Sequence, residues 1–465
     1  LALRQLFDSW PSDQLESFPM HSLQFKDLLI NFTTEFHLLW NDKGSGAHMS
    51  ASFWRPEISA NHLNNYFSLG DVAVEGYSQI NNRKIVAVVS DANAVDGTAL
   101  RPPERLAAVW NNQGSKGAAE ISVWRPIPPA GYVAMGNVCS VGYDSPPLTA
   151  IRCVRADLVI ASHLGEIIWN DKGSRANVDF SAWDIIPPEA QPGEAYLAPG
   201  TFLGVGSYAR LQTPGLVHSL RVELPIQMSD MPPPPAPRPD VEQPETPAEA
   251  TIHSCELPWF AVRDWELKPT EQLRLSPTYR LERSDRYQSV GVGVNEADTN
   301  QTYNWRTAKG EIGNESLTLS LSTGIELAHA WSMRTHLAKS HFSARLNSQL
   351  VHTGQSSKGW SQTAMADIAA YIPANKTVAA YVIRSEYKLL RTDGSQLATT
   401  ICYVNADQVY FRESLPTDAE NGDDLAALLP ESEPVTPNVL PDLVPEVDAA
   451  LEITPGDISD DSLFL

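Results

Sequence analysis

Hydrophobic residues between positions 25 and 225 occur in short runs rich in valine and aromatic residues, and Gly, Pro, Asn or Asp closes each run. Such runs are typical of β-strands separated by turns. One pattern occurs three times, beginning WNDKGS at Trp40, WNNQGS at Trp110 and WNDKGS at Trp169. In each copy a second tryptophan follows 14 residues after the first. This region is therefore a threefold internal repeat.

A single unit of this size holds too few strands to bury its own apolar face, whereas three units around a common axis can do so. The repeat thus predicts a threefold β-prism domain over residues 25–228. Tryptophans at equivalent positions are expected to meet near the axis or to cap its ends. Each Trp-Asn segment, with Gly and Ser after it, has the composition of a hairpin tip.

The three tips are the candidate ligand-binding sites of the prism. Their residues are Trp40, Asn41, Asp42, Trp110, Asn111, Asn112, Trp169, Asn170 and Asp171. Asp42 and Asp171 have two interpretations, since a carboxylate after Asn can stabilise a turn or can accept sugar hydroxyls or Ca²⁺. No spacing in the chain predicts a metal site.

A second β-rich domain is expected over residues 254–415, and it contains an unusual amphipathic stretch. Apolar and polar residues alternate for about twenty positions and then resume after Lys339. The apolar positions are Leu317, Leu319, Leu321, Ile325, Leu327, Trp331, Met333, Leu337, Phe342, Leu346 and Leu350. A membrane-crossing strand needs about ten such residues. The stretch predicts either a membrane-inserting hairpin or a long strand of a soluble, elongated antiparallel β-domain.

Four histidines lie in or beside this stretch, namely His329, His336, His341 and His352. Protonation of histidine near neutral pH can destabilise a stored conformation. They are therefore candidates for a pH switch, the alternative being ordinary solvated or hydrogen-bonded side chains.

Composition divides the rest of the chain. Residues 1–24 are an N-terminal extension, and the Pro-rich segment 229–253 is expected to be an extended linker. Much of the net charge of −22 comes from residues 416–465, which contain 13 acidic residues and no Lys or Arg. This tail is expected to be disordered.

Several functional classes lack support in the sequence. No basic surface of the kind that binds nucleic acid is indicated. The familiar phosphate-binding, nucleophile and metalloprotease motifs are absent from the sequence, as are CxxC pairs. A hydrolase using scattered carboxylates has neither a nucleophile nor a suitable carboxylate spacing to support it. The chain is expected to be no enzyme and to need no cofactor.

The segments WNDKGS, FWRPEI, VWRPIPPAGYVAMGNV and GYDSPPL with IRCVRADLV resemble the vacuolar protein sorting-associated protein 62 family over residues 35–225. The resemblance implies a β-prism, and related prisms occur in perforin-like toxins, where they bind target membranes. Residues 255–412, with LPWFAVRDWELKPTEQLRLSPTYRLERSDRY and EYKLLRTDG, are similar to modules of insecticidal-crystal-toxin-like proteins. That similarity implies an aerolysin-like domain with pore-forming potential.

Together these features favour a membrane-targeting pore-forming toxin, with insect membranes as one candidate target. The prism would bind glycans or lipid head groups, and the second domain would oligomerise and insert its hairpin. Before binding, the protein is expected to be a soluble monomer or dimer, secreted or released from the producing cell, with cytoplasmic production as another route. The alternative is a non-toxic carbohydrate-binding, membrane-binding or trafficking protein with two β interaction modules.

Overall fold

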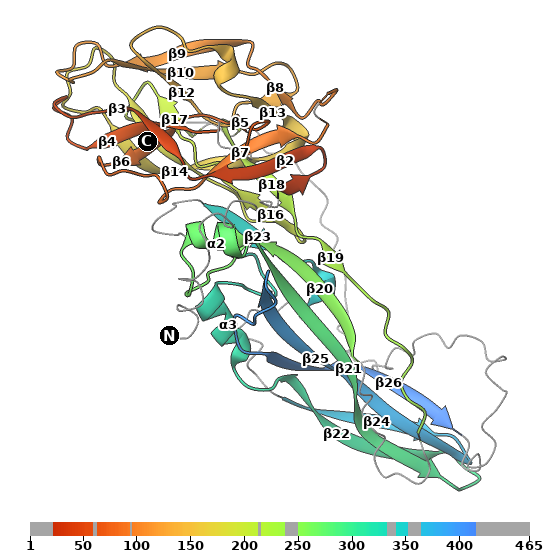
Figure 1. Cartoon of the computed structure of the whole chain (residues 1–465). Helices are drawn as coiled ribbons and strands as arrows, with labels where there is room; N and C mark the ends of the chain where they lie inside the picture. Colours follow the sequence, from red (N-terminus) through yellow and green to blue (C-terminus); the bar gives the residue numbers. More distant parts are fainter. Residues whose placement is uncertain are drawn as a thin grey trace, which may run out of the picture. The chain divides into compact units, whose positions relative to one another are not determined.

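The computed structural model describes residues 22–58, 63–93, 95–212, 215–237, 250–332, 341–351 and 364–414. Within these ranges the chain is almost entirely antiparallel β-structure, with two short α-helices (Figure 1). The prediction of an all-β fold is confirmed. The N-terminal extension up to residue 21 and the acidic tail lie outside the described residues.

The prism region contains nineteen strands between residues 23 and 227. They are β1 (Leu23–Phe25), β2 (Leu28–Thr33), β3 (Phe36–Asn41), β4 (Ala51–Pro56), β5 (Phe67–Ser68), β6 (Val72–Glu75), β7 (Val86–Asp91), β8 (Leu100–Arg101), β9 (Arg105–Asn111), β10 (Ile121–Ile127), β11 (Tyr132–Val133), β12 (Val138–Val141), β13 (Cys153–Arg155), β14 (Val159–Asn170), β15 (Ser181–Ile186), β16 (Glu194–Leu197), β17 (Leu203–Val205), β18 (Val217–Glu223) and β19 (Ile226–Gln227). Two 3₁₀ turns, η2 (Leu148–Ala150) and η3 (Ala156–Leu158), flank β13.

Each repeat places its two tryptophans in one three-stranded sheet. The sheets are β3-β4-β6, β9-β10-β12 and β14-β15-β17. A second set of strands extends each repeat, as β1-β2-β7-β5, β8-β13-β11 and the first half of β14 with β18 and β16. The threefold repeat read from the sequence therefore appears as three equivalent β-units.

A β-bulge precedes the first tryptophan of every repeat. The register shifts between Leu38 and Trp40, at the equivalent place between β9 and β10, and between Ile167 and Trp169. A bulge inserts one residue and redirects the side chains that follow it. All three first tryptophans are buried, so the shared bulge marks the point where each repeat turns its indole into the prism core.

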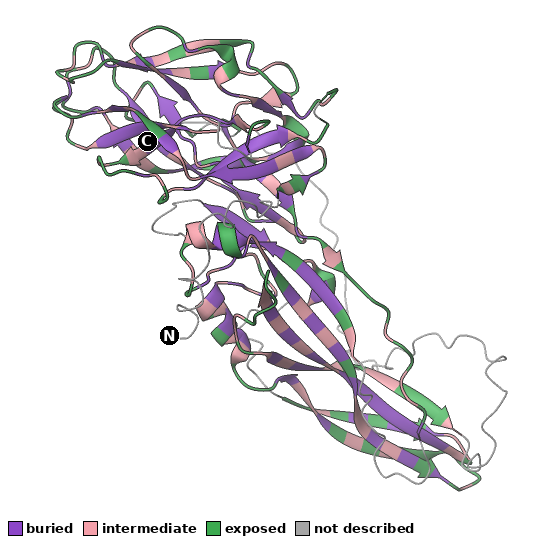
Figure 2. Cartoon of the chain, in the orientation of Figure 1, coloured by how far each residue is buried: buried purple, intermediate pink, exposed green. Residues whose placement is uncertain are grey.

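The second region contains β20 (Thr251–Pro258), β21 (Thr278–Asn295), β22 (Gln301–Glu311), β23 (Phe342–Arg345), β24 (Ala364–Ile372), β25 (Lys376–Arg391) and β26 (Ile401–Ser414). It also contains η4 (Trp259–Ala261), α2 (Pro269–Leu275), α3 (Glu315–Thr323) and η5 (Ser348–Leu350). Six of its strands join β19 in the sheet β19-β20-β21-β25-β26-β22-β24. Buried and partly exposed residues alternate along β21, as Figure 2 shows.

The two regions share one hydrophobic core. Phe32 of the prism packs against Trp259, with ring centroids 5.2 Å apart, and residues of both regions form a single buried cluster. The expected Pro-rich linker is only partly described. Its residues 229–237 lie along the second region, where Tyr287 and Tyr381 donate hydrogen bonds to the carbonyls of Pro232 and Pro235. Described residues of the two regions thus form one compact unit.

The expected extended hairpin over residues 317–350 is wrong for this conformation. Leu317, Leu319 and Leu321 lie in helix α3, which buries Ser316, Leu319 and Thr323 at helical spacing. Gly324, at φ 77°, ends the helix in the left-handed conformation that glycine adopts without strain. The alternation of Leu with Ser and Thr is compatible with a strand, but the same residues also fit the spacing of a helix.

The later part of the expected hairpin also differs. Ile325, Leu327, Trp331, Phe342, Leu346 and Leu350 are all buried in the shared core, but only Phe342 lies in a strand, β23. Met333 and Leu337 fall outside the described residues. With Leu319, seven of the eleven apolar positions predicted to face a membrane are therefore core residues, whereas Leu321 is 69% exposed.

Candidate functional site

The three tryptophans predicted at the hairpin tips form an aromatic cluster in the core. Trp40, Trp110 and Trp169 are 3%, 4% and 1% exposed. Their ring centroids lie 6.3, 5.8 and 5.8 Å apart, with interplanar angles of 70–75°. Edge-to-face pairs of this kind contribute about 0.5–1.5 kcal/mol each beyond their buried area. The tryptophans meet as the repeat predicted, and their burial gives them a role in the core of the prism.

Each indole donates a hydrogen bond to the next repeat, so the three bonds close a ring. The Trp40 N–H donates to the carbonyl of Ala119 at 2.9 Å. Trp110 donates to the Asp171 carboxylate at 3.1 Å, and Trp169 donates to the Asp42 carboxylate at 3.3 Å. These bonds join the repeats in the order one to two, two to three and three to one. We call the three tryptophans and these three bonds the hydrogen-bond ring.

The acidic tip residues are structural members of this ring. Asp42 and Asp171 are buried, and each also accepts the backbone N–H nine residues later, at Ala51 and Phe180. Burial raises the pKa of the Asp171 carboxyl. Asn112 takes the equivalent place in the second repeat and accepts from Ile121 N–H.

The remaining tip residues are turn formers. Asn41, Asn111 and Asn170 each accept the backbone N–H two residues ahead, at 3.1–3.2 Å. Such side-chain bonds stabilise a tight turn. The geometry thus gives every Trp-Asn-Asp position a role in the fold, and binding at these tips stays a prediction without a structural basis.

A more informative set of positions follows the second tryptophan of each repeat, at Arg55, Arg125 and Asp184. In the first repeat, Arg55 donates two hydrogen bonds to Asp71, at 2.9 and 2.8 Å, and a third to the carbonyl of Cys139. Asp71 is buried and also accepts the Cys139 N–H at 2.6 Å. This bidentate pair fastens the first repeat to the second.

The second repeat cannot form this pair. Backbone hydrogen bonds run from Asp71 N–H to Asn137 and from Asn137 N–H to Phe202, which makes these three positions equivalent. The Asn137 side chain accepts the Gly204 N–H and donates to the Trp124 carbonyl, so its amide has no charge to offer an arginine. Arg125 is exposed, and its guanidinium makes no hydrogen bond or ion pair with any residue in the described ranges.

The third repeat has Asp184 at this position, and it binds the second region. Its carboxylate pairs with His341, the residue that immediately precedes β23. The three equivalent positions thus differ in their partners. Arg55 pairs with a carboxylate of its own repeat, Arg125 has no partner among the described residues, and Asp184 pairs with a histidine of the second region.

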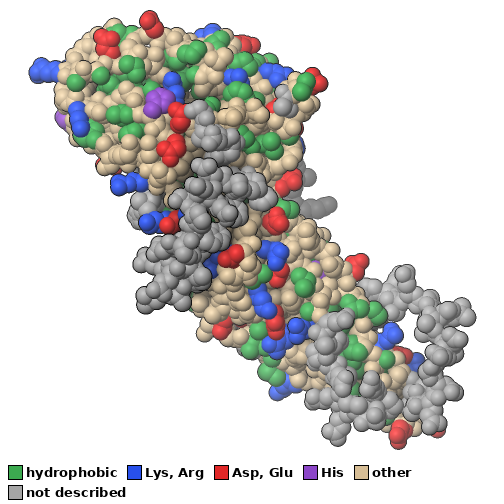
Figure 3. Space-filling model, in the orientation of Figure 1, with side chains coloured by type: hydrophobic (Ala, Val, Ile, Leu, Met, Phe, Trp, Pro, Cys, Tyr) green, Lys and Arg blue, Asp and Glu red, His purple; other side chains and the backbone are tan. Residues whose placement is uncertain are grey.

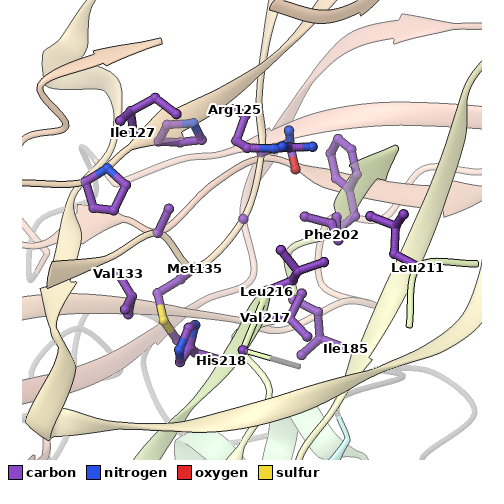
Figure 4. Close-up of a pocket in the computed structure, with 17 residues that line it drawn as sticks. Arg125, Ile127, Val133, Met135, Ile185, Phe202, Leu211, Leu216, Val217 and His218 are labelled. Atoms are coloured by element: carbon purple, nitrogen blue, oxygen red, sulfur yellow. The ribbon is translucent and has the colours of Figure 1, made fainter. Parts of the chain in front are cut away.

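A cavity of about 210 Å³ lies beside the unpaired arginine, between the second and third repeats (Figure 4). Seventeen residues line it, and no acidic residue is among them. Its walls are mainly apolar, from Met135, Ile185, Phe202, Leu216 and others. Figure 4 shows Arg125 on one side of this space and His218 on another.

His218 is the second basic residue of the cavity. Its Nδ1 is buried and has no hydrogen-bond partner within the described part of the chain. Burial lowers the pKa of this imidazole, so it is neutral at pH 7. The free buried nitrogen of a neutral imidazole can form one hydrogen bond with a ligand, as donor or acceptor according to its tautomer. Neither Arg125 nor His218 was predicted, because only comparison of the three folded repeats reveals them.

A second notable feature is the attachment of the chain between β22 and β24. Its strand β23 pairs with β16 and becomes the outer strand of the prism sheet β17-β15-β14-β18-β16-β23. Farther along, the buried Arg283 donates to the carbonyls of Gln349 and Leu350, at 3.0 and 2.9 Å. We call residues 312–351, in their described parts, the docked segment.

The structure describes two of the four predicted pH-sensing histidines. His341 pairs with Asp184, whereas His329 is exposed. His336 and His352 lie outside the described residues. The pH switch therefore stays a prediction.

Two further searches gave negative results over the described residues. No cluster of three or more His, Cys, Asp or Glu side chains there could hold a metal ion. None of the described helices has both the length and the apolar character needed to span a bilayer. Charges of both signs are interspersed on the face shown in Figure 3.

Comparison with solved structures places two proteins beside this chain. The crystal structure of GNIP1Aa from Chromobacterium piscinae is 28% identical over 40% of this chain, with a TM-score of 0.34. The match spans 34% of GNIP1Aa, about a third of its length. The crystal structure of Cry35Ab1 is 9% identical, covers 84% of this chain and 90% of Cry35Ab1, and has a TM-score of 0.30. Similarities of this strength carry no conclusion about function.

No curated protein gave a significant match. A profile of the vacuolar protein sorting-associated protein 62 family, however, matches residues 2–233. This range contains all three repeats and agrees with the family resemblance expected from the repeated motifs. The N-terminal half of the chain therefore belongs to the vacuolar protein sorting-associated protein 62 family.

Proposed function

We propose that this protein is a membrane-targeting, pore-forming toxin whose docked segment leaves the prism and extends a β-hairpin into a bilayer. The prism is the membrane-binding part, recognising lipid head groups or glycans, and insertion follows oligomerisation on the membrane. The protein would be released from its producing cell and act at target membranes, those of insects among the candidates. The observation that carries the proposal is the paired ribbon β22–β24, whose connection is docked on the prism.

The ribbon has the dimensions of a membrane hairpin. Nine residue pairs, from Gln301 with Ile372 to Lys309 with Ala364, stay in one register without a bulge. Transmembrane strands are about 9–11 residues long. The ribbon is a shorter and differently placed hairpin than the one expected from the sequence.

The two faces of the ribbon differ in polarity. Tyr303, Trp305 and Ile368 share the inner face, where Trp305 and Ile368 pack with the apolar cluster of β21, β25 and β26. On the outer face, Arg306 and Asp367 form an exposed ion pair. A barrel strand likewise alternates between lipid-facing and water-facing side chains. Turning the inner face to lipid would preserve this alternation.

The connection supplies additional length. The docked segment joins two strands that already run antiparallel, so releasing it allows the ribbon to grow without changing its pairing. The alternating residues 317–337 and 342–350 provide two further amphipathic arms once they are extended. In the folded protein, burial of Leu319, Ile325 and Trp331 holds this segment away from solvent. Binding of the prism to a membrane could therefore be coupled to release through β16 and β23.

Dye release from lipid vesicles tests the proposal. The purified chain should release dye and form SDS-resistant oligomers, both before and after proteolytic trimming of the acidic tail, at pH values from 5 to 9. Absence of both leakage and oligomers in every condition would contradict pore formation. It would favour the alternative, a non-toxic membrane-binding or carbohydrate-binding protein with two β interaction modules.

The alternative has one supporting observation of its own. The docked segment contributes to the shared core through many buried residues, and core residues normally serve stability alone. Vesicle binding without leakage would select this second function.

A further inference from the structure

The cavity between the second and third repeats is the place where an internal ion pair is missing. At the preceding interface, Arg55 pairs with Asp71 of its own repeat and reaches across to the Cys139 carbonyl of the second repeat. At the next interface the equivalent residues are Arg125 and Asn137, and Arg125 stays exposed. Replacing a carboxylate with an amide has left one guanidinium without its counter-ion.

The space beside this guanidinium suits an apolar group. Cavities of about 150 Å³ lined by apolar side chains accommodate benzene, and this cavity measures about 210 Å³. Met135, Phe202 and Leu216 contribute apolar wall, while His218 contributes one free buried nitrogen. A cationic rim beside an apolar interior is complementary to a molecule that carries a negative head and a hydrocarbon portion.

We infer that this cavity is a binding site for an anionic amphiphile, whose carboxylate or phosphate pairs with Arg125 and whose apolar part enters between the second and third repeats. His218 then exchanges a hydrogen bond with the head group. Guanidinium binds both anions through directional, charge-assisted hydrogen bonds. A sugar would leave the apolar walls unused, and a neutral lipid would leave Arg125 unpaired.

The inference deepens the proposed membrane-binding role of the prism and assigns it to named residues. Two sources supply this chemistry, a free single-chain amphiphile and the anionic lipid of a bilayer. Both present a negative head beside a hydrocarbon chain, and they differ in whether the chain is already held in a membrane.

The test measures binding to the full-length chain without requiring pore formation. Octanoate and octanol are compared by calorimetry, because they share a chain and differ in charge, and acetate serves as the head group alone. Flotation with phosphatidylglycerol or phosphatidylcholine vesicles supplies the bilayer arm. The variants are Arg125→Gln and Asn137→Asp, with Arg83→Gln as a control that removes an exposed arginine from the first repeat.

We expect the wild-type chain to prefer octanoate to octanol or phosphatidylglycerol to phosphatidylcholine. Arg125→Gln should weaken the anionic ligand about tenfold, the effect of losing one charge-assisted contact. Asn137→Asp should weaken it similarly, because the new carboxylate gives Arg125 the partner that Asp71 gives Arg55. This variant keeps an acceptor for the Gly204 N–H but loses the donor to the Trp124 carbonyl, so its folding is checked by urea denaturation before binding is measured.

The outcomes separate the possibilities. Octanoate binding assigns the site to a free amphiphile, whereas a phosphatidylglycerol preference alone assigns it to a bilayer lipid. Equal binding of charged and neutral partners, or equal loss in Arg83→Gln, overturns the inference. If the Arg125→Gln variant binds the anionic ligand as tightly as the wild type and also releases vesicle dye, this site is overturned. The proposed pore is then unaffected.

Discussion

A disulfide across β16 and β23 should lock the docked segment to the prism. Ala195 lies directly opposite Ala344 in the antiparallel register. The neighbouring bond from Ala198 N–H to the His341 carbonyl makes Ala195 and Ala344 a non-hydrogen-bonded pair. Cα atoms of such a pair lie about 4.5 Å apart, within the range that disulfides span. We therefore expect the double variant Ala195→Cys/Ala344→Cys to oxidise readily.

The expected stabilisation is large. The bond closes a loop of about 150 residues, and loss of chain entropy for a loop of that length gives about 5 kcal/mol. Both alanines are fully buried, so the two added sulfur atoms cost about 1–3 kcal/mol through overpacking. A net gain of about 2–4 kcal/mol in the free energy of unfolding remains, measurable by urea denaturation of the oxidised and reduced forms.

The assay for function is dye release from vesicles with and without a reducing agent. The oxidised double variant should bind vesicles as the wild type does but release no dye, and reduction should restore release. The reduced double variant carries the same packing change without the cross-link and is the matched control, and each single cysteine variant shows the effect of one added sulfur.

One result would refute the reasoning. If the oxidised variant, shown to be fully cross-linked by mass spectrometry, released dye at the wild-type rate, β23 would not need to leave β16. The docked segment would then have no part in insertion, whatever the fate of the ribbon.

Three further substitutions test the packing. Asp71→Asn should lower the free energy of unfolding by about 3–5 kcal/mol in urea denaturation, because it leaves the mostly buried Arg55 without a counter-ion. Asp171→Asn should flatten the pH dependence of stability: burial raises the folded-state pKa of this carboxyl above 3.8, so its contribution is present below that value and is lost as the pH rises through the raised pKa. An unchanged slope between pH 4 and 7 would contradict this. Gly291→Val should displace Trp305, since a Cβ at position 291 falls 2.2 Å from its ring, and a wild-type tryptophan fluorescence spectrum would show that the ribbon packs otherwise.

The repeat was predictable because it is a property of the sequence itself. The spacing of Trp40, Trp110 and Trp169 required three equivalent units, and burial of large aromatic side chains required them to meet. Their hydrogen-bond ring was not predictable, since each partner belongs to another repeat and lies far away along the chain.

The docked segment shows where periodicity reaches its limit. Leucines 317, 319 and 321 alternate with Ser and Thr, a pattern that also allows a helix with only Leu319 fully buried. The β22–β24 ribbon is hard to predict because its apolar face, which includes Tyr303 and Ile368, is interrupted by small residues and divided between two distant segments.

The candidate cavity depends on a difference between repeats. The motif containing Arg125 looks intact in the sequence, and only the change from Asp71 to Asn137 at an equivalent backbone position shows that its arginine has lost a partner. A search for repeated patterns in one sequence finds the residues that the repeats have in common, whereas this site arises from a residue that differs between them.

The position of β23 at the end of the prism sheet has a practical consequence for dissecting the molecule. A fragment ending after β19 would contain every repeat but would leave β16 with an unpaired edge and bare the apolar surface around Ala195 and Leu197. Exposed edges of this kind invite pairing with other chains. Recombinant production of the Vps62-family half alone should therefore include a tethered peptide that supplies the missing strand.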